Sequence, residues 1–69
     1  MTFARDVNPV RIRREQQQML LVELADASNC HAAMLSMCEG GFVPGVDSRE
    51  RIAKALETTP QDLWPQEYR

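Results

Sequence analysis

The residues best suited to chemistry gather in one stretch, SNCHAAMLSMCEGG, at positions 28–41. Cys30, Met34 and Cys38 recur at the spacing of one helical face and offer soft sulfur ligands, and His31 is the only histidine. A closed metal site draws ligands from more than one element, and the chain has no second cluster of such residues. If both cysteines share a helix, their α-carbons lie roughly 12 Å apart, beyond disulfide reach. We therefore interpret both as small core residues and expect no bound metal.

The same residues offer little to an enzyme. One histidine and two helix-bound cysteines supply no nucleophile with a general base and an orienting group. The segment EGGFVPG at positions 39–45 lacks the lysine and the preceding strand of a phosphate-binding glycine loop. We expect neither catalysis nor a cofactor.

Charge is distributed unevenly along the 69 residues, whose net charge is −2. Residues 1–19 carry four arginines against two carboxylates, whereas residues 20–48 carry four carboxylates and no lysine or arginine. Residues 49–69 hold four groups of each sign. A surface that binds phosphate groups should be basic, so only the two ends of the chain could build one.

Length and hydropathy predict a single domain over residues 1–69, with its core at about 8–65. No apolar run is longer than four residues, as at residues 19–22, which is far too short to cross a bilayer or to form the core of a signal peptide. We expect a cytoplasmic protein with no membrane contact.

The sequence predicts five helices and no strand, and these helices must position the candidate functional residues. Asn8 followed by Pro9 predicts the start of a first helix that runs to about Gln17. A second helix is expected over residues 19–27. Asn29 is the expected turn residue, because asparagine tolerates a positive φ. The apolar face of the second helix is expected to comprise Met19, Leu20, Leu24 and Ala27.

A third helix is expected over residues 31–39 and should end at Gly40 and Gly41. Leu35 and Cys38 should point inward, with Met34 at the margin. In the loop that follows, Phe42 is expected to fold back over the core.

Two further helices are predicted in the C-terminal third. Asp47 with Glu50 has the spacing of a capping box and predicts the start of the fourth helix. Thr59 followed by Pro60 predicts the start of a short fifth helix that stops at Pro65. The apolar residues Ile52, Ala53 and Leu56 are expected to occupy one face of the fourth helix, and the fifth helix carries Leu63 and Trp64.

Two segments, LADASNCHAAMLSMCEGG and PGVDSRERIAKALETTPQDLWP, resemble the Cro/repressor-type helix-turn-helix domain, also called the XRE family. The resemblance covers about residues 10–65, with the motif at about 20–39. Leu24-Ala25, the turn residue Asn29 and the RIAKAL segment carry it, and the closing ALETTPQDLWPQEY resembles the tail of Ner-like phage regulators. The resemblance implies a five-helix fold and a small, phage- or prophage-derived transcriptional regulator that binds operator DNA as a homodimer. It also implies an ion pair of Arg14 with Glu39, or of Arg13 if the alignment shifts by one residue.

In such motifs the N-terminal part of the third helix enters the major groove. The side chains that the resemblance places at base edges are His31, Ala32, Ala33, Ser36 and Met37. None of them offers a bidentate fork, so direct readout would depend on apolar contact with thymine methyl groups and on DNA shape. Contacts with the phosphate backbone are expected from Asn29, Arg11, Arg13 and Arg49, with Arg51 as a further candidate.

A second function remains open on the same residues. The outward surface of the third helix is small and apolar, which suits docking against another protein. On this interpretation the chain is a helix-turn-helix domain that acts as a protein-binding partner, such as an anti-repressor or an assembly module. Phe42, Val43, Trp64 and Tyr68 are candidates for a dimer surface.

Overall fold

The computed structural model describes residues 8–68, and this part of the chain contains five α-helices and no strand. The all-α, five-helix expectation is therefore confirmed for the described residues. The helices are α1 (Pro9–Gln16), α2 (Leu21–Ser28), α3 (Ala32–Glu39), α4 (Val46–Ala55) and α5 (Pro60–Leu63), followed by a 3-10 helix, η2 (Pro65–Glu67).

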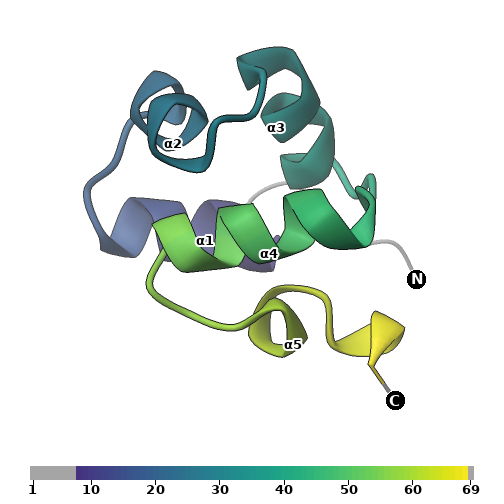
Figure 1. Cartoon of the computed structure of the whole chain (residues 1–69). Coiled ribbons are helices and arrows are strands. Elements are labelled where there is room, and N and C mark those ends of the chain that lie inside the picture. Colours follow the sequence, from purple (N-terminus) through teal and green to yellow (C-terminus); the bar gives the residue numbers. More distant parts are fainter. Residues whose placement is uncertain (1–7, 69) are drawn as a thin grey trace.

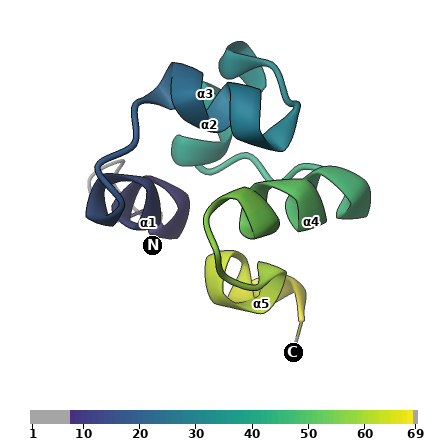
Figure 2. The ribbon, with the colours of Figure 1, turned by 60° about the vertical axis from the view of Figure 1, so that its left-hand side comes forward.

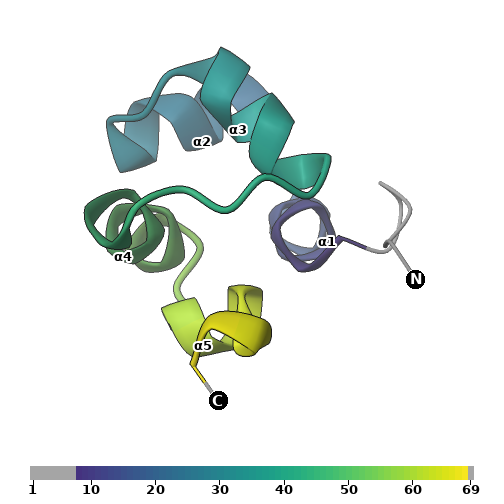
Figure 3. The same ribbon diagram turned by 90° about the vertical axis from the view of Figure 1, so that its right-hand side faces the viewer.

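The helices lie in three tiers. In Figure 1, α2 and α3 lie above α1 and α4, and α5 with η2 lies below. Figures 2 and 3 show α1 and α4 on opposite sides of the space beneath α2 and α3. This space is filled by nine buried side chains: Val10, Leu24, Leu35, Cys38, Ile52, Ala53, Leu56, Leu63 and Trp64. The inward residues predicted for the third helix and the apolar face predicted for the fourth helix are all among them.

Asn8 begins α1 as the sequence predicts. Its side-chain oxygen accepts hydrogen bonds from the backbone N–H groups of Val10 (2.9 Å) and Arg11 (3.3 Å). Its amide nitrogen donates to the carbonyl of Cys38 at 3.1 Å. Asn8 thus caps α1 and also binds the last turn of α3, and it is buried in doing so.

The start of α2 differs from the prediction. Leu20 is the N-cap residue in an extended conformation, so the helix begins at Leu21 rather than at Met19. The carboxylate of Glu23 accepts the backbone N–H of Leu20 at 2.7 Å, which fixes this start. Because the helix starts later, its buried face differs from the predicted one. Leu24 is buried as expected, but Leu20 and Ala27 are exposed. Ser28 occupies the next inward position and donates to the carbonyl of Leu24 at 2.7 Å.

Two predictions for the loop between α3 and α4 are wrong. Phe42 does not cover the core, because its side chain is 46% exposed; Val43 packs against the core instead, and Pro44 is buried. The fourth helix begins at Val46 with Gly45 as its N-cap, so Asp47 lies in the first turn and caps nothing. A carboxylate there still interacts favourably with the helix dipole. The fifth helix starts as predicted, with the hydroxyl of Thr59 accepting the N–H of Asp62.

The two cysteines do not share a helix. Cys30 lies in the turn before α3, because Asn29 ends α2 and His31 is still extended, whereas Cys38 lies in the last turn of α3. Both are free thiols. Burial raises the pKa of Cys38 to about 11. Residues 8–68 hold no group of three His, Cys, Asp or Glu side chains placed to share a metal ion. None of the helices described here has the length and hydropathy to traverse a bilayer.

Candidate functional site

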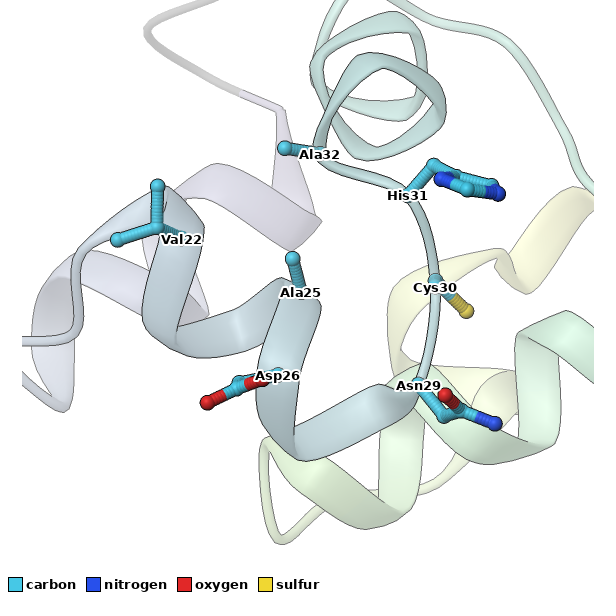
Figure 4. A pocket seen from close by; sticks show the side chains of 7 residues that line it. All are labelled: Val22, Ala25, Asp26, Asn29, Cys30, His31 and Ala32. Atoms are coloured by element: carbon cyan, nitrogen blue, oxygen red, sulfur yellow. The ribbon is translucent and has the colours of Figure 1, made fainter.

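The candidate site is built on α2, α3 and the three residues between them. Asn29 adopts the left-handed conformation expected of it, with φ 56° and ψ 42°. The backbone N–H groups of Asn29 and Cys30 donate to the carbonyls of Asp26 and Ala25, which closes the end of α2. His31 is the N-cap residue of α3, but its side chain accepts no capping hydrogen bond. The turn is therefore defined by the backbone, and the side chains of Asn29 and His31 extend outward from it (Figure 4).

An ion pair fixes α3 to α1. The Nε and Nη2 atoms of Arg14 donate to the two carboxylate oxygens of Glu39 at 2.6 and 3.1 Å. The Nη1 atom donates to the carbonyl of Met19 at 2.8 Å, just before α2. Only 14% of the Arg14 side chain and 4% of the Glu39 side chain are exposed. The hydrogen bond to Glu39 raises the pKa of Arg14 above its usual value. This is the pair that the resemblance implies, formed by Arg14 and not by Arg13.

The outward surface of α3 is narrow and poor in hydrogen-bond donors. His31 and Ala33 are exposed, and the side chain of Met37 is 52% exposed. Ala32 and Ser36 are only partly accessible. The five side chains that were expected to face a ligand therefore lie on α3 and the residue before it, but Ala32 and Ser36 are less exposed than the other three.

A shallow hollow of about 340 Å³ adjoins this surface, between α2 and the turn (Figure 4). Val22, Ala25 and Ala32 give it an apolar wall, and Asp26, Asn29, Cys30 and His31 complete its lining. Sequence reasoning missed Val22 and Asp26. Their outward direction follows once α2 is known to begin at Leu21, because Leu24 and Ser28 then define the opposite, buried face.

The arginines expected at the phosphate backbone have partners within the chain. Arg11 pairs with Glu15 on the same helix at 3.1 Å. Arg13 donates to the carbonyls of Leu56 and Glu57 at 3.0 Å each, and so caps the end of α4.

Arg49 is turned toward the C-terminal segment. Its guanidinium lies 5.4 Å from the centre of the Tyr68 ring and 3.9 Å from a carboxylate oxygen of Glu67. Its side chain is only 12% exposed, and its buried Nε atom has no hydrogen-bond partner in the described structure. Of the candidates for a dimer surface, Phe42 and Tyr68 are exposed and Val43 is partly buried, whereas Trp64 belongs to the core.

Arg51 is the cation that reaches the turn. Its Nη2 atom lies 3.9 Å from the sulfur of Cys30 and 3.4 Å from the hydroxyl of Ser48. Asp26 adds a carboxylate to the lining of the hollow, and Glu23 on α2 and Asp47 on α4 are also exposed. None of these three carboxylates forms an ion pair with another described residue.

The geometry therefore presents a narrow apolar helix beside a polar turn, with one exposed guanidinium and several carboxylates around it. Such a surface can exclude water from methyl groups and donate a few hydrogen bonds, but its positive charge is limited. Comparisons with protein-family models, with curated proteins and with solved structures find no match for this chain.

Proposed function

We propose that the chain is a Cro/repressor-type helix-turn-helix domain of phage or prophage origin that binds double-stranded DNA and acts in the cytoplasm as a small transcriptional regulator. The observation that carries the proposal is the unit formed by α2, α3 and their three-residue turn. Asn29 sets the angle between the helices, and the pair of Arg14 with Glu39 holds α3 by its C-terminal end. The N-terminal end of α3 is left exposed, which is the end that such motifs insert into the major groove.

The proposed readout is apolar. Side chains as small as Ala32 and Ala33 allow the helix backbone to approach the base edges closely, and Met37 adds a flexible apolar contact. The C5 methyl of thymine is the major-groove feature that such side chains can recognise. Val22 extends the apolar surface from α2, the first helix of the motif, since its exposed side chain lines the same hollow as Ala32.

The proposed affinity of a single copy is modest, because few cations face the DNA. A homodimer on a two-fold symmetric operator would combine two such contacts and supply most of the useful binding. Arg11 keeps an exposed side chain and stays in the proposal as a backbone contact, whereas Arg13 and Arg49 are assigned to structural contacts within the chain.

Selection of bound duplexes from a random pool tests the proposal. We expect an enriched sequence with two-fold symmetry, bound with an affinity that falls as a power of the salt concentration. Replacing thymine by uracil in the enriched duplex removes only the methyl groups. This change should weaken binding about fourfold for each methyl that the protein buries. Absence of binding to any duplex at low salt would overturn the proposal.

A second candidate function is the docking of another protein on the same surface. The observation that favours it is the combination of apolar side chains with unpaired carboxylates around α2 and α3, which suits a basic amphipathic partner better than a phosphate backbone. Asp26→Lys separates the two functions. It should strengthen binding to DNA by adding a cation and weaken the docking of a basic partner.

A further inference from the structure

The side chain of Arg51 occupies a position that no other cation of residues 8–68 shares. It extends from the middle of α4 to the turn between α2 and α3, where its Nη2 atom meets the sulfur of Cys30. Both of its contacts are long, 3.9 Å to that sulfur and 3.4 Å to the Ser48 hydroxyl, so they orient the guanidinium without saturating it. Its remaining donors make no hydrogen bond to another described residue, and the residue is exposed.

Two further donors lie on the same turn. Figure 4 shows the side chains of Asn29, Cys30 and His31 extending to the same side, away from Val22 and Ala32. Cys30 lies between the other two in the chain and is the residue that Arg51 contacts, so the guanidinium lies beside the turn segment that carries both donors. The side chains of Asn29 and His31 are exposed and make no hydrogen bond to another described residue.

Neither carboxylate close to Arg51 on α4, Asp47 or the adjacent Glu50, forms an ion pair with this cation. Asp47 lies four residues before Arg51 on α4, a spacing that allows an ion pair, yet no such pair forms within 4.0 Å. Arg49, two residues before Arg51, is instead directed at Glu67 and Tyr68. The structure therefore gives the two arginines different environments: Arg51 contacts the turn between α2 and α3, and Arg49 contacts the C-terminal segment.

We propose that Arg51, together with the amide of Asn29 and the imidazole of His31, grips one phosphate of the DNA backbone at the turn of the motif. The inference rests on the proposed DNA binding and assigns its main backbone contact. A guanidinium is suited to this role because its planar donors match two phosphate oxygens. The contact would fix the register of α3 without reading any base.

The test compares the salt dependence of duplex binding among three variants of the full chain. Arg51→Gln should lower the slope of log K against log salt by about 0.9, which corresponds to about eightfold weaker binding at 0.1 M salt. The loss should be equal for operator and random duplexes, because a phosphate contact carries no sequence information. Arg51→Lys should retain most of the slope. Lys54→Gln, which removes the same charge from an exposed position one turn later on α4, is the matched control and should change the slope by less than half as much.

The outcomes distinguish this inference from the function on which it rests. If the wild-type chain binds no duplex at low salt, the proposed function fails and the phosphate contact fails with it. If the wild-type chain binds but Arg51→Gln keeps the wild-type slope, or loses no more than Lys54→Gln, the assignment to Arg51 is wrong while DNA binding stands. Circular dichroism of each variant at the assay temperature ensures that only folded protein is compared.

Discussion

Removing the arginine of the buried ion pair should nearly unfold the domain. Arg14→Met deletes the two hydrogen bonds to Glu39 and the one to Met19, and it leaves a carboxylate whose side chain is only 4% exposed without a counter-charge. Losing one partner of such a pair typically costs about 3–5 kcal/mol. A 69-residue chain has a total stability of roughly 3–10 kcal/mol. The loss therefore corresponds to a fall of about 12–40 °C in Tm.

Urea and thermal unfolding measure this loss directly. Helix content follows from far-ultraviolet circular dichroism, and the emission of Trp64, which is buried beside α5, reports on the core independently. Two controls isolate the cause. Arg11→Met removes an exposed pair and should change stability by less than about 0.5 kcal/mol. The double variant Arg14→Met/Glu39→Leu removes both charges and should regain most of the loss.

A cost of Arg14→Met below about 1 kcal/mol would contradict this prediction, since an unpaired buried carboxylate should cost more than that. A double variant as unstable as Arg14→Met would contradict it equally. In that case the lost packing of the arginine stem, and not the stranded charge, would account for the effect.

Three other perturbations test further parts of the structure. Asn8→Ala should destabilise the domain by about 1–3 kcal/mol in urea titrations, because it removes the cap of α1 and leaves a carbonyl at the end of α3 without its partner; a loss under 0.5 kcal/mol would contradict this. Phe42→Ala should shift the free energy of unfolding by less than about 0.5 kcal/mol, since the residue is 46% exposed. A loss of the size that a core cavity causes would instead support the prediction that Phe42 covers the core. Because burial raises the pKa of Cys38 from 9.0 to about 11, the folded state favours the neutral thiol. The stability that this contributes is complete below pH 9 and should fall by about 2–3 kcal/mol as the pH rises toward 11, a decline that Cys38→Ala should lack.

The local starts and turns of this fold were largely readable from the sequence. Asn8-Pro9 and Thr59-Pro60 begin helices in the structure because the cap and the proline act within three residues of one another. Asn29 likewise takes the left-handed conformation for a reason local to its own side chain. The start of α4 was misread for the opposite reason. Pro44 is buried, and the extended Gly45 that follows becomes the N-cap two residues before Asp47, a constraint set by tertiary packing.

The partners of the arginines could not be read in the same way. Arg13 binds carbonyls of residues 56 and 57, and Arg49 packs against residues 67 and 68, so their roles depend on how distant segments meet. In the sequence they look like solvated charges beside a binding motif. Arg51 differs from Arg49 by two positions, which is enough to place the two side chains on different sides of a helix with 3.6 residues per turn.

The contacts that hold α1 in place affect the order in which the chain folds during its synthesis. This helix contributes one buried side chain, Val10, to the core. Its polar anchors lie far downstream: Asn8 binds residue 38, Arg14 binds residue 39, and Arg13 and Gln17 bind the carbonyl of residue 56. An eight-residue helix is not stable alone in water. This helix is therefore synthesised before its anchors, and it can be fixed in place only after residues 38, 39 and 56 have followed.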